Sequence, residues 1–181
     1  MNNQKRIYEI VLTGLGIALV FVATLFIKIP NAIDGYFNLG DGFILIFSSF
    51  LNPLLAFMVG GLGSALADVA GGYAYYFIPT LIIKGLEGMI VSYLMTSFRK
   101  ELKINYKLQI LAYLSGSTIM VIGYFLAKWF MKGNVYVAML GIPENIFQAA
   151  AGLIVAYIVF PILNNLYKNQ YLHHLRNERL L

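Results

Sequence analysis

The sequence predicts an all-α integral membrane protein, a six-helix bundle with a short second helix. Of its 181 residues, 60% are hydrophobic and 12% are charged, whereas soluble domains average roughly 45–50% and 25%. Apolar runs of the length of one membrane crossing, about 20 residues, recur along the chain, and the mean hydropathy is +0.74. These runs use most of the sequence, so we expect one transmembrane domain over residues 1–181 and no separate soluble domain.

Six helices are predicted in order. The first apolar run, residues 7–28, is longer than the roughly 7–15 residues of a signal-peptide core, so it is a retained helix. The turn-forming residues that follow make up loop one, residues 29–41. The next apolar stretch is too long for one straight crossing, and Asn52-Pro53 divides it into two helices. The remaining five helices are predicted at residues 42–51, 53–71, 76–98, 108–131 and 143–166.

The positions of Lys and Arg predict that both termini are cytoplasmic. Cytoplasmic loops accumulate these residues, and six crossings place nine of them inside and three outside. If the short second helix does not cross, the better orientation places eight of these residues inside and four outside, which is a weaker bias. Residues 99–107 then form a basic cytoplasmic loop. The net charge of +5 is explained by contact with anionic lipid, without a nucleic-acid partner.

Two ionisable side chains lie deep in the fourth predicted helix. Glu87 is near its midpoint, and Lys84 is three residues away on the same face. A charge at that depth costs at least ~2.5–3.5 kcal/mol, so both should face protein or a wet cavity. Asp68, near the end of the third helix, is expected to reach Lys84. Two interpretations remain open. In the first, Lys84 and Glu87 form an ion pair that fixes helix packing, and Asp68 is simply wetted at the interface. In the second, Lys84 and Glu87 are charged anchors at the base of an outward-opening cavity.

Asn145 and Gln148 form a second polar group at the start of the last helix. Their spacing of three residues places them on one face. Carboxamides in bundles commonly bond between helices, and they also bind ligands, so both roles stay open.

Aromatic residues are concentrated in the predicted outer half. Most are expected to form an interfacial belt, and a minority to stack on a flat ligand. Trp129, the single tryptophan, and Tyr73 are candidates for stacking.

Motifs for chemistry are absent from the sequence. No Gly-Lys dipeptide is present, so there is no phosphate-binding loop. There is no Cys, and His173 and His174 are interpreted as surface residues of a cytoplasmic tail. We therefore predict no catalytic residue, no metal and no cofactor, and we disfavour an intramembrane enzyme.

Small residues on the first helix suggest a docking face. Gly14 and Ala18 are four residues apart, a spacing that lets another helix approach closely.

Three segments resemble the S component of energy-coupling factor (ECF) vitamin transporters. They are residues 61–73 (GLGSALADVAGGY), residues 82–88 (IIKGLEG), and Ile142-Pro143-Glu144-Asn145. The resemblance covers nearly the whole chain and is nearest to the riboflavin, pyridoxine and hydroxymethylpyrimidine branch.

The resemblance implies a substrate-capture subunit of a prokaryotic plasma membrane. Such a subunit docks through its first helix onto a transmembrane T component that carries two ATP-binding-cassette ATPases, and it topples to release its vitamin. The family's Ala-x-x-x-Ala docking motif appears here as Gly14-x-x-x-Ala18. Pyridoxine or hydroxymethylpyrimidine is the first expected substrate and riboflavin the second.

The resemblance also implies roles for individual residues. Lys84 and Glu87 form hydrogen bonds to a heteroaromatic ring or its hydroxyls, and Asn145 forms a hydrogen bond to it from the last helix. Asp41 completes the site from loop one. The predicted substrate-binding set is Asp41, Asp68, Tyr73, Lys84, Glu87, Trp129, Asn145 and Gln148. The alternative is a self-sufficient carrier or channel in which Asp68, Lys84 and Glu87 relay ions or protons.

Overall fold

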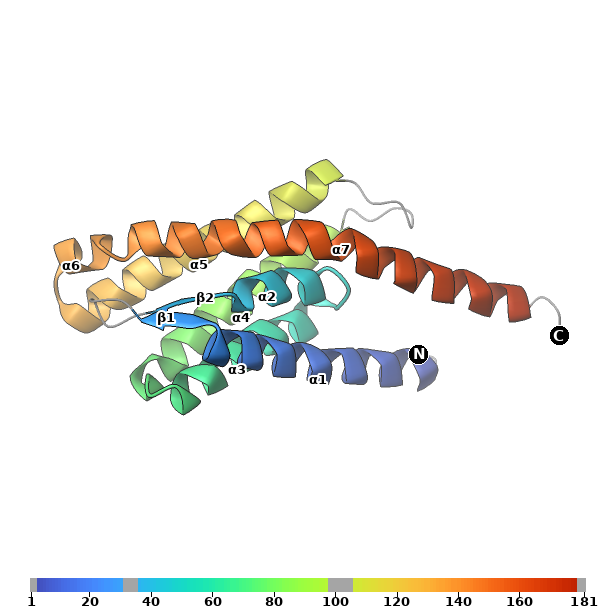
Figure 1. The fold of residues 1–181 in the computed structure, drawn as a ribbon, viewed down its shortest axis with the longest axis horizontal. Coiled ribbons are helices and arrows are strands. Elements are labelled where there is room, and N and C mark those ends of the chain that lie inside the picture. Colours follow the sequence, from blue (N-terminus) through green and yellow to red (C-terminus); the bar gives the residue numbers. More distant parts are fainter. Residues whose placement is uncertain (1–2, 31–35, 98–105, 179–181) are drawn as a thin grey trace.

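The computed structural model describes residues 3–30, 36–97 and 106–178. Its regular elements are helices apart from one short antiparallel ribbon (Figure 1), which confirms the all-α prediction. The predicted loop at residues 99–107 lies mostly outside the described residues. The elements are α1 (Asn3–Phe26), β1 (Lys28–Pro30), β2 (Tyr36–Asn38), α2 (Gly40–Ser48), α3 (Pro53–Ala70), the 3₁₀ turn η1 (Ala74–Tyr76), α4 (Phe77–Ser97), α5 (Tyr106–Lys132), α6 (Val135–Met139) and α7 (Ile142–Glu178).

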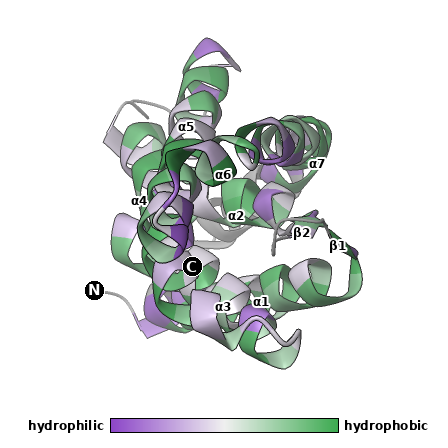
Figure 2. Ribbon diagram, turned by 90° about the vertical axis from the view of Figure 1, so that its left-hand side faces the viewer, coloured by the Kyte–Doolittle hydropathy of each residue, from purple (hydrophilic) through white to green (hydrophobic). Residues whose placement is uncertain are grey.

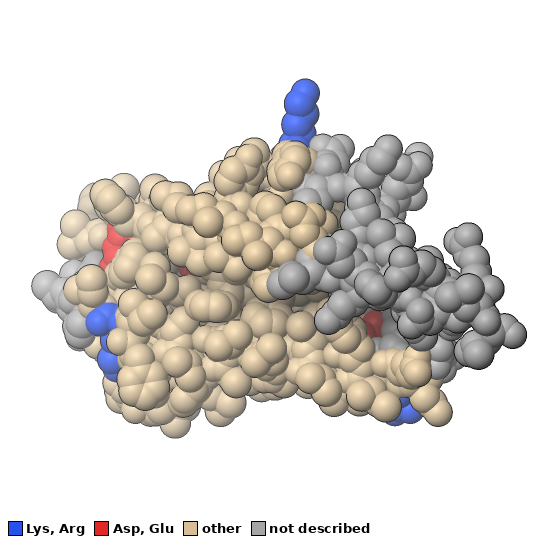
Figure 3. Space-filling view, turned by 45° about the vertical axis from the view of Figure 1, so that its right-hand side comes forward, with Lys and Arg blue, Asp and Glu red and all other residues tan. Residues whose placement is uncertain are grey.

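Among the described residues, five segments are long and apolar enough to cross a membrane. They are α1, α3, α4 with its preceding 3₁₀ turn, α5, and α6 joined to the first part of α7. Hydrophobic residues cover much of these helices (Figure 2), and many of them are exposed. On the face in Figure 3, Lys, Arg, Asp and Glu occupy only small parts of the described surface. The protein is thus a multi-pass membrane protein, with both termini toward the same end of the molecule (Figure 1).

The predicted short second helix is present as α2, in the centre of the molecule. It has nine residues, and eight of them are buried. Its side chains belong to two hydrophobic clusters, one shared with α4, α5 and α7 and the other with α1 and α3. A helix that is largely apolar on all sides is favoured where other apolar elements surround it, which explains why the nine-residue α2 packs inside the bundle.

The break between α2 and α3 lies at Asn52-Pro53, as predicted. The Asn52 side chain caps α3 by accepting a hydrogen bond from the Leu55 backbone N–H at 3.1 Å. Pro53 occupies the first turn of α3, where its missing N–H has no cost. This local chemistry sets the start of α3.

Glycines bring α3 and α4 into close contact. A Cβ on Gly60 would lie 2.2 Å from the carbonyl oxygen of Lys84, and one on Gly88 would lie 2.6 Å from that of Ala56. On the other side of α2, a Cβ on Gly152 of α7 would lie 2.8 Å from the Cβ of Asp41. The small-residue faces of α3 and α7 therefore hold Lys84 and Asp41 near the centre.

The structure departs from the sequence prediction at three places. Loop one contains the β1–β2 ribbon, in which Ile29 pairs with Phe37. The added helix α6 begins at Asn134, whose side chain accepts hydrogen bonds from the two backbone N–H groups of Tyr136 and Val137. The last helix continues to Glu178, well past the predicted end at 166. The end was predicted where the apolar pattern fades, but no Gly or Pro follows to stop the helix there.

Candidate functional site

A cavity lies between loop one, the end of α3, and helices α4, α5 and α7. Its own volume is about 50 Å³, and its empty space reaches about 530 Å³ when the open mouth is included. Its lining is polar and aromatic: Thr24, Tyr36, Asn38, Ser64, Asp68, Tyr76, Thr80, Lys84, Tyr124, Lys128, Glu144, Asn145 and Gln148.

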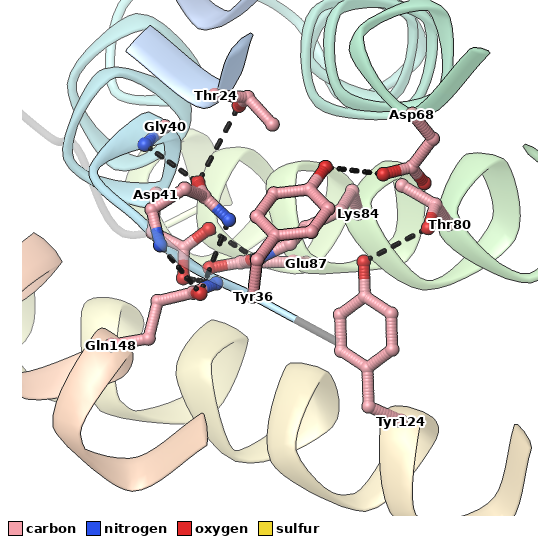
Figure 4. A network of polar contacts seen from close by, with 11 residues as sticks. Thr24, Tyr36, Gly40, Asp41, Asp68, Thr80, Lys84, Glu87, Tyr124 and Gln148 are labelled. Carbon is pink, nitrogen blue, oxygen red and sulfur yellow. Dashed lines mark hydrogen bonds and ion pairs between the residues drawn. The ribbon is translucent and has the colours of Figure 1, made fainter. Parts of the chain in front are cut away.

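Lys84 lies at the centre of an ion network at this cavity (Figure 4). Its ammonium group donates to the Asp41 carboxylate and, at 3.1 Å, to the Glu87 carboxylate. All three side chains are at most 2% exposed. Glu87 is the middle residue of α4, and Asp41 is in the first turn of α2, where the helix dipole favours a negative charge.

Gln148 and Asn38 connect this ion network to loop one. The Gln148 carboxamide donates to Asp41 at 2.9 Å, and its oxygen accepts from the backbone and side chain of Asn38, both at 3.1 Å. The Asn38 oxygen accepts from the backbone N–H of Gly40 at 2.9 Å and, at 3.5 Å, from the hydroxyl of Thr24. Side chains from α1, β2, α2, α4 and α7 thereby form one continuous polar cluster (Figure 4).

Asp68 has a different partner from the predicted one. Among the described residues, Lys84 forms ion pairs with Asp41 and Glu87, and Asp68 instead accepts a hydrogen bond from the Tyr36 hydroxyl. Asp41 reaches Lys84 because α2 begins beside α4. Asp68 is only 3% exposed, so the expectation of a simply wetted carboxylate is wrong.

Tyr36 closes one side of the cavity from loop one. Burial, and then the nearby Asp68 carboxylate, raise the pKa of the Tyr36 hydroxyl, which keeps its proton for the bond to Asp68. Its ring lies 4.9 Å from that of Tyr73, and the Lys28 ammonium is 5.7 Å from its centroid. Tyr73 therefore supports Tyr36 from behind and does not line the cavity.

The structure brings most of the predicted substrate-binding residues together. Asp68, Lys84, Asn145 and Gln148 line the cavity, and Asp41 and Glu87 bond to Lys84 behind that lining. Trp129 is apart from them: it is 47% exposed, and its ring packs 6.1 Å from that of Phe125.

Sequence reasoning did not single out several lining residues. Tyr124 and Lys128 are one turn apart on α5, and Tyr124 hydrogen-bonds Thr80 at 3.1 Å. Lys128 is only 7% exposed although its side chain is charged. The i,i+4 spacing of Tyr124 and Lys128 was a usable signal.

The predicted docking residues lie on an exposed face of α1. Gly14 and Ala18 are both exposed, and a Cβ added to Gly14 would meet no atom within 4 Å. Large apolar side chains on either side of this small-residue strip, such as Val11 and Val22, are exposed as well.

Within the described residues, no group of three or more His, Asp or Glu side chains is placed to hold a metal ion. The arrangement combines hydrogen-bonding groups and aromatic rings at a buried ion network, which is the chemistry of ligand binding.

Comparison with known proteins identifies the family. Residues 4–168 match the family described as ECF-type riboflavin transporter, S component. The chain belongs to this family of ECF S components. An uncharacterized protein of Pyrococcus woesei is 37% identical over 137 residues, which are 75% of this chain and 88% of that protein. The thiamine precursor transporter HmpT of Lactococcus lactis is 28% identical over 165 residues, 90% and 92% of the two chains.

Membership makes this chain part of a transporter family and not of an enzyme family. For an S component, a substrate site among the membrane-spanning helices is the expected feature. The cavity around Lys84 is located there.

Proposed function

We propose that this S component captures a water-soluble vitamin or vitamin precursor in the cavity beside Lys84. The observation that carries the proposal is the cavity itself, because it adjoins a buried, hydrogen-bonded ion network. Intramembrane charges are costly and are by default functional. A flat ring would gain stacking from Tyr36 and Tyr124 while Asn145 and the other polar groups fix its orientation.

The substrate is a pyrimidine precursor or pyridoxine in the first instance, and riboflavin in the second. The similarity to a protein named thiamine precursor transporter supports the first, and the family description supports the second.

In this proposal the chain works with a T component and two ATP-binding-cassette ATPases in a prokaryotic plasma membrane. Both termini are cytoplasmic and the cavity opens outward, in keeping with the termini at one end of the bundle and the β1–β2 ribbon at the other (Figure 1). The T component docks on the α1 face around Gly14 and Ala18, which is exposed and free of bulky side chains at its centre.

A binding screen tests the proposal. The purified chain is titrated calorimetrically with pyridoxine, hydroxymethylpyrimidine, thiamine and riboflavin. We expect one of them to bind at submicromolar concentration, and Glu87→Gln to weaken that binding because the amide no longer holds the Lys84 ammonium as an ion pair. Absence of binding to every member of the panel contradicts the proposal.

A self-sufficient carrier or channel is the second candidate, because buried ionisable groups also serve in proton relays. Asp41, Lys84 and Glu87 form a bonded cluster of that kind. Liposomes that contain only this chain separate the two functions: substrate or ion flux without partner proteins supports the carrier, and binding without flux supports the S component.

A further inference from the structure

A second hollow lies between α5 and α7, and it shares no lining residue with the cavity beside Lys84. We call it the α5–α7 groove. Both helices belong to membrane-spanning segments, so lipid surrounds the groove. Its volume is about 470 Å³. Because an apolar cavity of about 150 Å³ already holds benzene, the groove has room for several methylene groups of a chain laid along it.

The floor of the groove is apolar. It is formed by Tyr113, which is buried, and by Leu153, which packs against the same hydrophobic cluster. The Tyr113 hydroxyl is used in the interior: it hydrogen-bonds the Ser49 hydroxyl at 3.0 Å and accepts from the Gln109 carboxamide at 3.2 Å. The floor therefore presents the ring of Tyr113 and not its polar atom.

The rims of the groove favour a flexible chain over a helix. Ile110 and Leu114 of α5 form one rim, Ile154 and Ile158 of α7 are on the other, and all four are at least 43% exposed. Helices in a membrane associate closely through small residues, whereas the described residues that line this groove are all Ile, Leu or Tyr. Branched side chains on both rims hold a second helix away but leave space for an acyl chain between them.

A positive charge and two tyrosines mark one end of the groove. The rings of Tyr106 and Tyr157 lie 6.4 Å apart across the two helices, and tyrosine is typical of the membrane–water interface. Lys107 is exposed, and its spacing of three and seven residues places it on the α5 face of Ile110 and Leu114. The start of α5 lies toward the same end of the molecule as both termini (Figure 1).

We propose that the α5–α7 groove binds an acyl chain of one anionic phospholipid, whose headgroup phosphate pairs with Lys107. The chain gains van der Waals contact with two helices at once, and the lysine attracts an anionic headgroup at the membrane surface. Both helices also contribute side chains to the cavity beside Lys84. The bound lipid thus braces two walls of that cavity from outside.

A lipid competition tests the site on the unmodified protein. The purified chain is mixed with equal amounts of palmitoyl-oleoyl phosphatidylglycerol and palmitoyl-oleoyl phosphatidylcholine, and bound lipids are counted by native mass spectrometry. The two probes have the same acyl chains, so a difference between them reports on the headgroup charge. We expect one phosphatidylglycerol to be retained, with a preference of about fivefold, the ratio for one lysine near the membrane surface.

Variants test the two parts of the site separately. Lys107→Gln should abolish the preference for phosphatidylglycerol, and Arg6→Gln, at an exposed position on α1, should keep it. Ile154→Trp fills the groove and should abolish retention of both lipids. Ile122→Trp makes a similar change at an exposed position of α5 outside the groove and should retain them. If the melting temperature shows that Ile154→Trp has unfolded, Leu114→Trp on the opposite rim replaces it.

Several results overturn the assignment of a lipid. Equal retention of the two lipids by the wild-type chain contradicts it, and so does a preference that survives Lys107→Gln. Equal loss of preference in Arg6→Gln shows diffuse attraction to basic residues and no site at Lys107. Unchanged lipid retention in the folded groove-filling variant excludes the groove.

Other occupants of the groove would also be recognised. The chain has no cysteine, so disulfide-linked dimers of Ile154→Cys in membranes would show that a second copy covers the groove. Loss of co-purification with the T component in Ile154→Trp would show that a partner helix does. Either result overturns the lipid site. Vitamin capture is tested separately by the binding screen and stands or falls independently of these results.

Discussion

Lys84 remains charged inside the bundle because two carboxylates from different parts of the chain bond it. Its pairing with Glu87 was predicted from their separation of three residues on one helix. Its pairing with Asp41, 43 residues away, depends on how α2 packs against α4, which no local pattern reveals. The same limit applies to Asp68, whose partner Tyr36 lies 32 residues earlier in the ribbon.

Removal of Lys84 should cost far more stability than removal of one of its partners. Lys84→Gln leaves two buried carboxylates without their cation, and breaking a buried pair in this way costs about 3–5 kcal/mol. Glu87→Gln retains a hydrogen-bonding group and removes one of the two negative charges beside Lys84, so its cost should be smaller. Thermal unfolding in detergent measures both. Equal destabilisation by the two variants contradicts the described ion network.

At the scale of elements, helix contacts and loop one determine the cavity. Five long helices and the break at Asn52-Pro53 were predictable because apolar length and capping residues are local signals. The ribbon was missed because three-residue strands are too short to show an alternating pattern. α6 was missed although Gly133, with a positive φ of 63°, and the capping Asn134 mark the end of one helix and the start of the next.

The glycine contact between α3 and α4 should be intolerant of a methyl group. In Gly60→Ala the new Cβ meets the backbone of Lys84, and such overpacking typically costs about 1–3 kcal/mol. Gly14→Ala makes the same change where no atom lies within 4 Å, so it should be neutral or stabilising. The melting temperatures of the two variants provide the check, and a similar decrease in both is inconsistent with this packing.

The bond between Tyr36 and Asp68 should control the exchange of ligand. Because Tyr36 lines the cavity from loop one and donates a hydrogen bond to Asp68 of α3, Tyr36→Phe should raise the ligand dissociation rate by about tenfold, the effect of losing a hydrogen bond to a charged group. Stopped-flow measurement provides the rate. Tyr75→Phe removes a hydroxyl from a tyrosine that is 51% exposed and should leave the rate unchanged. An unaltered rate in Tyr36→Phe means that loop one does not close the site through this contact.

At the scale of the whole molecule, the cavity that we propose for binding and the face that we propose for docking are separate surfaces. The cavity is formed by loop one, α3, α4, α5 and α7, whereas the exposed strip with Gly14 and Ala18 lies farther along α1. The sequence indicated both, since charges and small residues in apolar helices are conspicuous. The shape of the cavity was not predictable, because it depends on side chains from α1, β2, α3, η1, α4, α5 and α7.

Gly14→Leu should separate these two properties. A bulky side chain on the exposed strip blocks close approach of another helix, so co-purification with the T component should be lost while vitamin affinity is retained. Gly14→Ala, which adds only a methyl group in open space, serves as the matched control. Normal assembly of Gly14→Leu would place the docking face elsewhere.

The central claim is that the vitamin occupies the cavity beside Lys84. Asn145 lines that cavity, and its neighbour Ile146 is 54% exposed. The most direct measurement is calorimetric titration of Asn145→Leu and Ile146→Leu with the vitamin that binds the wild-type chain. We predict loss of binding in Asn145→Leu, because an apolar side chain replaces the carboxamide that lines the cavity. We predict wild-type affinity in Ile146→Leu. Wild-type affinity in both variants would contradict the claim.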